Sequence, residues 1–483
     1  MATETELLNP YQNNPLKKKM LTVIAVYIGV FVGMITSIGN GIFLPLAAEE
    51  IGGADIYPLA ATLGGVVSVG AMPLFAYLAS KIPHFRRQGL ALSLLAGVLC
   101  VVLRALAPNM WWIIIPSVFL GIESAAIYTF GYAMIRDCFN QKQAGVYLGF
   151  IGTMFAAGQL AAPVGVAAII QFAGWRTVPA LQAVLWVICA IMVFAGAKIS
   201  KEESQKISYA EGKFDTLGAI ALVGVLGGLI LALSLGRFAP VGSPVSWMFF
   251  GIAAVALIVT VVNIRKKKDK AIIPSYAFKD RNTIAMTAAN FLSPFDSMST
   301  NFFLPAFIMT VLLKTPLESS FALSLFSILG IVVSPFFGRW VARIGTCKPI
   351  IVWFSGLWRV VITIALIVVL KPGANLIVID ILMFLAGLYS TAGGVIASTG
   401  PQIMIEPKIR QQSNALVQLG QNFGGTIGIA VYSAVIAAYG LIDGMQIGLM
   451  IACAGAVALM ISGLLMKKPT WQDEVPGPTL EAR

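Results

Sequence analysis

Charged residues are scarce in this sequence: Asp, Glu, Lys and Arg make up only 11% of its 483 residues, whereas a soluble domain carries about a quarter. Hydrophobic residues reach 58% and the mean hydropathy is +0.86. This composition excludes an ordinary soluble domain and predicts a chain that lies mostly in lipid.

Histidine and cysteine are also rare, which removes most kinds of catalytic and metal site. The single histidine, His84, falls in a predicted loop, and the five cysteines show no CxxC or metal-like spacing. The glycine-rich segments lack the GK[ST] of a phosphate-binding loop. We therefore expect no metal, no cofactor and no disulfide framework. No nucleophile and base lie at one depth, so we do not expect an enzyme.

Apolar runs of about 20 residues, each long enough to cross a hydrocarbon core of ~30 Å, recur along the whole chain. They predict an all-α polytopic membrane protein with fourteen transmembrane helices, at roughly 20–47, 57–80, 89–107, 110–135, 144–172, 177–198, 215–235, 245–264, 283–313, 319–340, 347–370, 375–400, 411–439 and 443–466. The polar start and the length of the first apolar run argue against a cleavable signal peptide.

The net charge of +12 is distributed unevenly about these segments. Most Lys and Arg, including Lys17 to Lys19 and the run 265–270, fall on one side if the amino terminus is cytoplasmic. The sequence therefore predicts a multi-pass protein of the cell membrane with both termini in the cytoplasm. The charge bias needs no nucleic-acid partner, although the 265–270 run could also bind anionic lipid.

Two segments of the first half recur in the second half at nearly the same separation. The pairs are 73–87 with 335–348, and 119–126 with 385–392, where Glu123 aligns with Tyr389. Such repeats are typical of transporters. They predict two six-helix halves with two helices between them, arranged 6+2+6.

This arrangement predicts five regions in a monomeric chain. They are a cytoplasmic tail (1–19), an N-terminal six-helix bundle (20–198), a two-helix insert with basic flanking loops (199–282), a C-terminal six-helix bundle (283–466) and a second cytoplasmic tail (467–483).

Three motifs resemble a known family. The segment "GRWVARIG", with Gly338, Arg339, Arg343 and Gly345, resembles the loop signature of the major facilitator superfamily. Residues 214–236 and 272–282 resemble the central insert of the fourteen-helix drug:proton antiporter branch, and 421–430 its penultimate helix. The resemblance covers nearly the whole chain. It implies a major facilitator fold, alternating access and coupling to protons, in a branch with bile-acid-type transporters and multidrug exporters.

Several positions depart from the patterns of that branch. Ser80 and Ala342 stand where the loop signature has Asp, and Ser117 where the fourth helix of proton antiporters has Arg. The fifth-helix antiporter motif keeps only Gly158 and Pro163. These departures weaken the expectation of drug:proton antiport and leave the expectation of the fold intact.

Three carboxylates fall inside predicted spans: Glu123 and Asp296 near mid-depth, and Asp380 nearer the outer face. Burial disfavours the charged form of a carboxylate and so favours proton exchange. We interpret all three as candidates for proton coupling; the alternative is a structural carboxylate tied to a hydroxyl or a basic side chain. The proline and polar residues of 291–301 predict a broken helix that lines a cavity.

Two arginines also fall in spans. Arg359, near mid-depth, needs either a protein carboxylate or an anionic substrate, whereas Arg104 lies close enough to the outer end to snorkel. The candidate substrate-binding residues are Arg359, Tyr128, Trp358, Tyr389, Asn301, Gln418 and Gln421.

These features predict a proton-coupled secondary transporter of a small amphipathic organic solute. The mid-depth arginine and the eroded antiporter motifs favour uptake of an organic anion, similar to a bile acid, by proton symport. The alternative is multidrug efflux by proton antiport.

Overall fold

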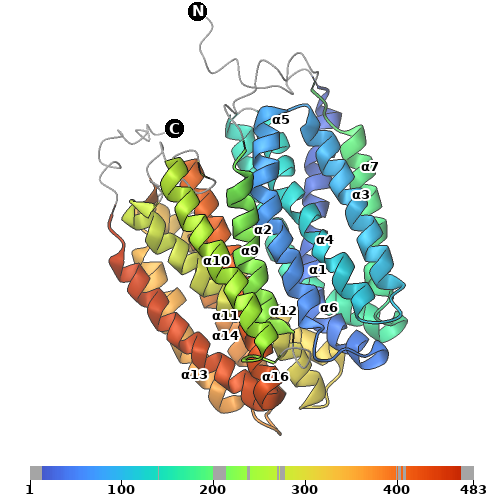
Figure 1. The fold of residues 1–483 in the computed structure, drawn as a ribbon, viewed down its shortest axis with the longest axis vertical. Coiled ribbons are helices and arrows are strands. Elements are labelled where there is room, and N and C mark those ends of the chain that lie inside the picture. Colours follow the sequence, from blue (N-terminus) through green and yellow to red (C-terminus); the bar gives the residue numbers. More distant parts are fainter. Residues whose placement is uncertain are drawn as a thin grey trace, which may run out of the picture.

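The computed structural model describes residues 14–139, 141–199, 214–235, 240–268, 278–398 and 410–468, with 271, 400, 404 and 405 between them. Every element of these ranges is helical, which confirms the predicted all-α fold. Figure 1 shows two helical bundles side by side, the first blue to green and the second yellow to red.

The chain forms the bundles in sequence order. The N-terminal bundle contains α1 (Leu16–Ile51), α2 (Pro58–Lys81), α3 (Phe85–Ala105), α4 (Trp111–Ala126) continuing through the π-helix η2 (Ile127–Gly131) into α5 (Tyr132–Cys138), α6 (Gln141–Ala173) and α7 (Thr177–Ala195). The C-terminal bundle contains α11 (Arg281–Thr310), α12 (Pro316–Ile344), the π-helix η6 (Ile350–Trp358) continuing into α13 (Arg359–Val369), α14 (Leu376–Ser398) and α16 (Arg410–Leu465). Between the bundles come α9 (Thr216–Ser234) and α10 (Pro244–Lys267).

Eleven helices of the described ranges are long and apolar enough to cross a membrane. The predicted number of fourteen and the 6+2+6 arrangement stay predictions. Three features account for the difference between eleven and fourteen. Helix α16 counts once, although Gly440 leaves helical geometry with φ 82°. Helix α6 contributes only the shorter apolar helix Ala157–Ala173, and α11 is rich in polar residues.

Glycines allow the closest helix crossings within each bundle. A Cβ atom added at Gly121 of α4 would lie 1.9 Å from the carbonyl oxygen of Gly64 on α2. In the C-terminal bundle, a Cβ at Gly424 of α16 would lie 1.9 Å from the carbonyl oxygen of Phe291 on α11. A larger residue at either position would force two backbones apart, so these glycines set the packing that positions the interior side chains.

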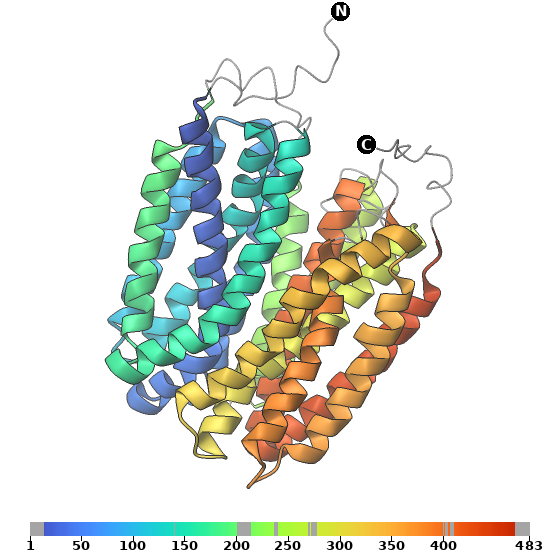
Figure 2. The ribbon, with the colours of Figure 1, turned by 180° about the vertical axis from the view of Figure 1, so that it is seen from behind.

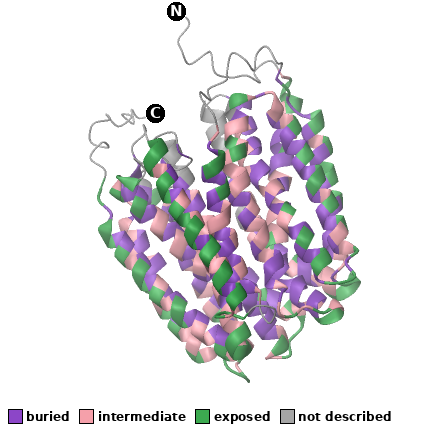
Figure 3. Cartoon of the chain, in the orientation of Figure 1, coloured by how far each residue is buried: buried purple, intermediate pink, exposed green. Residues whose placement is uncertain are grey.

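The two insert helices are joined by one buried carboxylate. Asp215 accepts hydrogen bonds from the Gly218 amide (3.0 Å), from Asn263 Nδ2 (2.6 Å) and from Lys267 Nζ (2.6 Å). These contacts cap α9 and fix it to the end of α10. Helix α9 packs against α2 and α16, one helix from each bundle, whereas α10 is exposed along most of its length (Figure 3). The insert therefore bridges the bundles through α9.

Helix α1 begins and α16 ends at one end of the molecule, named here the terminal end; the opposite end is the far end (Figure 1). One cluster of buried apolar side chains, which includes Phe43 of α1 and Phe302 of α11, spans both bundles at the far end. Two further clusters lie toward the terminal end, and each belongs to a single bundle. The shared core therefore lies at the far end.

Specific contacts between the bundles also lie at the far end. The rings of Tyr57 and Phe302 stack with centroids 5.8 Å apart, and the Ser324 hydroxyl donates to the carbonyl of Leu160 at 3.0 Å. A Cβ at Gly41 of α1 would lie 3.1 Å from the Phe302 carbonyl oxygen. Figure 2 shows the two ribbons approaching most closely at this end. The bundles are thus joined at the far end.

The sidedness of the membrane is a prediction that labelling can test. Because the basic residues gather at the terminal end, we expect a cysteine at the exposed position Lys266 to react with an impermeant maleimide only after cells are permeabilised. Lys266 is preferable to Lys267, whose ammonium binds Asp215. A cysteine at exposed Gly373, in a loop at the far end, should react in intact cells; the reverse pattern would overturn the predicted orientation.

Candidate functional site

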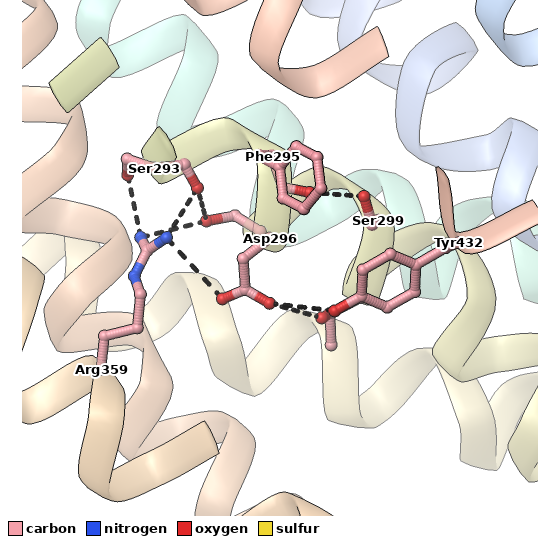
Figure 4. Close-up of polar contacts among 8 residues, drawn as sticks. Ser293, Phe295, Asp296, Ser299, Arg359 and Tyr432 are labelled. Carbon is pink, nitrogen blue, oxygen red and sulfur yellow. Dashed lines mark hydrogen bonds and ion pairs between the residues drawn. The ribbon is translucent and has the colours of Figure 1, made fainter. Parts of the chain in front are cut away.

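Asp296 and Arg359 form an ion pair inside the C-terminal bundle (Figure 4). Arg359 Nη1 lies 3.7 Å from Asp296 Oδ2, and the two residues are 1% and 2% exposed. Two opposite charges at this depth stabilise one another only where polar groups replace the water that both have lost. The surrounding residues supply such groups.

Arg359 is held on three sides. Its Nη1 donates to the Ser293 carbonyl (2.7 Å), and its Nη2 donates to the hydroxyls of Ser293 (2.8 Å) and Ser297 (3.3 Å). The guanidinium also lies over the ring of Tyr389, 4.3 Å from its centroid, in a cation–π contact. The guanidinium is therefore engaged mainly with its own bundle.

Asp296 has a second set of partners on its other oxygen. Thr300 donates to Oδ1 at 3.0 Å, and the Tyr432 hydroxyl of α16 lies 3.5 Å from the same atom. Among the described residues, Asp296 Oδ2 and Arg359 Nε have no hydrogen-bond partner. The two charged groups are thus close, but their hydrogen bonds are incomplete within the described part of the chain.

Tyr432 and Ser293 were not among the predicted site residues. Ser293 was visible only as part of the polar segment around Asp296, and Tyr432 as one of two tyrosines in a glycine- and alanine-rich span. The tyrosine ring stacks on Phe303 with centroids 6.3 Å apart, which holds its hydroxyl toward Asp296.

The predicted break in the helix around Asp296 is wrong. Helix α11 runs without interruption from Arg281 to Thr310, with Pro294 and Pro305 inside it. A proline inside a helix removes a single backbone donor, and a membrane helix tolerates this loss. The hydroxyls of Ser297 and Ser299 make additional hydrogen bonds within the helix, to the carbonyls of Ser293 and Phe295, at 2.9 and 2.5 Å.

A π-helix lies beside the charged residue of each bundle. In the C-terminal bundle η6 ends immediately before Arg359, and in the N-terminal bundle η2 begins shortly after Glu123. Single π-turns inside α-helices are frequent at functional sites, because they shift the side chains that follow around the helix axis. Nothing in the apolar sequence of either segment predicted this geometry.

Glu123 lies in the interior of the N-terminal bundle and is 3% exposed. In the part of the chain that the structure describes, its Oε1 has no hydrogen-bond partner and no cation lies within ion-pair distance. The neighbouring hydroxyl, that of Ser124, donates instead to the Gly121 carbonyl at 3.2 Å. Glu123 is therefore a buried carboxylate without the counter-charge that Asp296 has.

The aligned positions of the repeat explain part of this difference. Tyr389, which aligns with Glu123, faces Arg359. Glu123 faces Gly97 of α3, where an added Cβ would lie 3.2 Å from Glu123 Cγ. At this position the third helix of the C-terminal bundle carries the guanidinium of Arg359, whereas the third helix of the N-terminal bundle carries Gly97, which has no side chain.

Arg104 does not snorkel to the surface, contrary to the expectation from its place near the helix end. It is 0% exposed, donates from Nη2 to Asn40 Oδ1 at 2.7 Å, and lies 5.0 Å from the ring centroid of Phe43. The side chain turns inward because α1 offers it both an amide oxygen and an aromatic face.

Asp380 lies apart from the other two carboxylates. It is half-buried and lines a hollow of about 410 Å³ between the bundles, with Val164, Leu317, Glu318, Phe321 and Leu376. The structure therefore brings Asp296, Arg359 and Tyr389 together in one bundle, places Glu123 in the other, and leaves Asp380 near the far end.

The remaining predicted substrate-binding residues are dispersed. Tyr128 makes an edge-to-face contact with Tyr132 (5.7 Å), and Trp358 donates its Nε1 to the Leu385 carbonyl at 3.0 Å. Asn301 lies where α11 crosses α1, and its Oδ1 has no partner among the described residues. Gln418 and Gln421 are half-buried on α16. These residues do not form one cluster with Arg359.

The loop-signature residues lie at the terminal end of α12. Arg339 and Arg343 are exposed, Gly338 is half-buried, and Gly345 ends the helix in the left-handed conformation with φ 73°. In the first repeat, Arg86 instead forms a buried ion pair with Asp137, which the sequence did not predict. That pair fixes the start of α3 to the end of α5.

The chain also matches known proteins. It matches the family model of the Major Facilitator Superfamily over residues 26–218 and 286–480. It is 24% identical over 428 residues to "Multidrug transporter protein MdtP" of Bacillus subtilis (strain 168), covering 87% of this chain and 75% of that one. It is 21% identical over 483 residues to "Uncharacterized transporter YebQ" of Escherichia coli (strain K12), covering 94% and 97%.

A solved structure shares the fold. The crystal structure of an auto inhibited POT family peptide transporter superposes with a TM-score of 0.66 at 14% identity, covering 93% of this chain and 96% of that one. Together with the family match, these findings show that the chain belongs to the Major Facilitator Superfamily. It is a multi-pass membrane transporter of that superfamily, and its relatives are transporters rather than enzymes.

Proposed function

We propose that this transporter couples the movement of a small amphipathic organic solute to a proton gradient. The observation that carries the proposal is the pair of deeply buried carboxylates, Glu123 and Asp296, each in the interior of a different bundle. A buried carboxylate without a cation favours its neutral form, whereas one beside a guanidinium favours its charged form. We assign the exchangeable proton to Glu123 and a supporting role to the Asp296–Arg359 pair.

The distribution of contacts supports alternating access as the mechanism. The bundles share their apolar core at the far end and keep separate cores toward the terminal end. Rocking of one bundle against the other would exchange the closed end, which is the usual motion of transporters built from repeats. The internal contacts of Arg359 and Glu123 would travel with their own bundles during that motion.

For the solute, we propose an amphipathic or cationic compound that is exported in exchange for protons. Arg359 is engaged by Ser293, Asp296 and Tyr389, so it has little capacity left for an anionic substrate. The multidrug transporter among the relatives supports the same choice. We also propose that the protein lies in the cell membrane and is a monomer.

Uptake of an organic anion similar to a bile acid, by proton symport, remains the second candidate. One observation favours it: Arg359 Nε has no hydrogen-bond partner among the residues described, so one N–H could reach a carboxylate after a rearrangement. The proposed proton site at Glu123 would serve symport and antiport equally.

Flux through purified protein in liposomes tests both candidates. With an imposed pH gradient, we expect a radiolabelled cationic amphipath to accumulate in the compartment from which protons leave, and an anionic amphipath of similar size to be left at equilibrium. A protonophore should abolish the accumulation. Accumulation of the anion with the protons would establish symport instead. If the pH gradient changed the flux of neither solute, the proposed proton coupling would be wrong.

A further inference from the structure

Six buried side-chain atoms inside the N-terminal bundle have no hydrogen-bond partner in the described part of the chain. They are Nε and Nη1 of Arg104, Nε2 and Oε1 of Gln182, Nε1 of Trp186 and Oε1 of Glu123. These four residues are 0 to 3% exposed. Buried polar atoms in folded proteins nearly always have a partner, from the protein or from ordered water. So many orphaned atoms in one bundle call for a shared partner.

On helix α3, Arg104 shares one face with two residues that lie closer to Glu123, and the three form one line along the helix. Gly97, Cys100 and Arg104 recur at spacings of three and four residues, which places them on one face of the helix. Gly97 faces Glu123 directly, with its added Cβ 3.2 Å from Glu123 Cγ. The Cys100 thiol lies within electrostatic range of both Arg104 and Glu123. This face therefore leads from Arg104 to Glu123.

Helix α7 presents a second line. Gln182, Trp186 and Cys189 follow spacings of four and three residues, again on one face. The Cys189 thiol lies within electrostatic range of Glu123, and α7 packs along α3. The two lines thus converge on Glu123.

Both lines run toward the far end. Helix α3 ends at Ala105 and α7 begins at Thr177, and Arg176 Nη2 donates to the Ala107 carbonyl at 3.3 Å, which joins the two segments there. Arg176 also forms an exposed ion pair with Glu50 of α1. A charged, solvent-facing group therefore lies at the far end, beyond the last buried polar side chains of the two lines.

We propose that a file of water molecules lies between α3, α4 and α7, completes the hydrogen bonds of these six atoms, and carries protons between the far face and Glu123. A hydronium at the inner end would give its proton to a carboxylate oxygen of Glu123, leaving water and a neutral carboxylic acid. The titratable groups near Glu123 on this route are Cys100 of α3, Cys189 of α7 and Tyr128 of η2, and Arg104 lies beyond Cys100, where its guanidinium binds Asn40 of α1.

This route has a functional consequence. It lies inside one bundle and avoids the interface at which the bundles meet, so Glu123 could exchange protons with the far side while that interface is closed to the solute. The role of these water molecules in transport rests on the proton coupling proposed above. Their presence between the helices does not depend on it.

The native cysteines test the hydration. Four variants that each keep one of Cys100, Cys189, Cys138 and Cys347 would be exposed to Ag⁺ in chloride-free buffer, and the remaining free thiol measured with a maleimide after denaturation. All four thiols are buried, at 6% exposure or less. We expect Cys100 and Cys189 to react at least ~10-fold faster than Cys138 and Cys347, because water-sized ions enter only a hydrated file. Equal rates for all four would overturn the proposal.

Transport tests the proton route. Gln182→Leu keeps a similar volume and removes both orphaned polar atoms, so we expect it to slow pH-driven accumulation of solute at least ~10-fold. Exchange of labelled for unlabelled solute at equal pH needs no net proton movement and should be unchanged. Ser234→Ala of α9 is a matched control, because that buried hydroxyl also lacks a partner among the described residues but lies outside the bundle.

The outcomes separate this route from the proposed function. Unchanged pH-driven accumulation in Gln182→Leu would overturn the route as the path of the proton. If Glu123→Gln then still abolished accumulation, proton coupling at Glu123 would stand without the file. If wild-type protein showed no pH-driven accumulation, the proposed coupling would fail, while fast Ag⁺ reaction of Cys100 and Cys189 would still establish the hydrated file.

Discussion

Arg359→Met is expected to destabilise the protein by about 3–5 kcal/mol, because it leaves the Asp296 carboxylate buried without its cation. It also removes three hydrogen bonds to Ser293 and Ser297 and the contact with the Tyr389 ring. For a bundle of this size the loss corresponds to a fall in melting temperature of roughly 10 °C. Heating purified protein in detergent and following the monodisperse fraction by size exclusion would measure it.

A double-mutant cycle identifies the cause of that loss. Asp296→Asn with Arg359→Met removes both charges, so it should recover most of the stability lost in Arg359→Met alone. Arg359→Lys keeps the charge but cannot donate to both Ser293 atoms at once, and we expect an intermediate loss. If Arg359→Met melts at the wild-type temperature, the ion pair does not support the fold, and Arg359 becomes available for an anionic substrate.

Hydropathy and charge predicted the class of fold because each span must satisfy its own backbone in lipid, and so reads as one long apolar helix. The repeat of 119–126 in 385–392 indicated two related halves without any structure. The local geometry of η2, η6 and the turn at Gly440 was not predictable in this way. A π-turn shifts the side chains that follow it around the helix axis, but segments that are apolar on nearly every side show no trace of that shift in their sequence.

The candidate site was partly visible in the sequence. A mid-depth arginine needs an anion, which the sequence left open as either a protein carboxylate or an anionic substrate; in the structure Asp296 is that carboxylate. Its other partners, Ser293 and Tyr389, depend on how each helix is rotated about its axis, which the polar pattern of a single helix does not determine. The prediction for Arg104 was wrong for the same reason. Its place near a helix end suggested a side chain that reaches the surface, whereas Asn40 on another helix holds it inside.

Asp296 and Glu123 looked alike in the sequence, as single carboxylates near mid-depth. Packing separates them. Asp296 lies beside Arg359, Thr300 and Tyr432, while Glu123 faces the backbone of Gly97. Burial disfavours the charge of both carboxylates, but only Asp296 has a cation and hydroxyl donors that oppose this effect. This difference is the reason for assigning the exchangeable proton to Glu123.

Glu123→Gln is expected to abolish pH-driven accumulation of the solute, a loss of at least ~100-fold, while equal-pH exchange of labelled solute continues. The amide keeps the shape of the side chain and resembles the neutral carboxylic acid, but it cannot release a proton. Because Glu123 has no cation among the described residues, its neutralisation leaves no charge uncompensated, and the fold should be retained. Both fluxes would be measured on the same purified variant in liposomes.

Asp296→Asn is the informative comparison for this result. It removes a charge that Arg359 needs, so we expect lower stability together with reduced exchange, rather than the selective loss of accumulation expected for Glu123→Gln. The opposite assignment would be indicated if Asp296→Asn lost only accumulation while Glu123→Gln still concentrated solute with unchanged pH dependence. In that case the proton resides on the paired carboxylate of the C-terminal bundle, and release of the proton must coincide with closure of the Asp296–Arg359 pair.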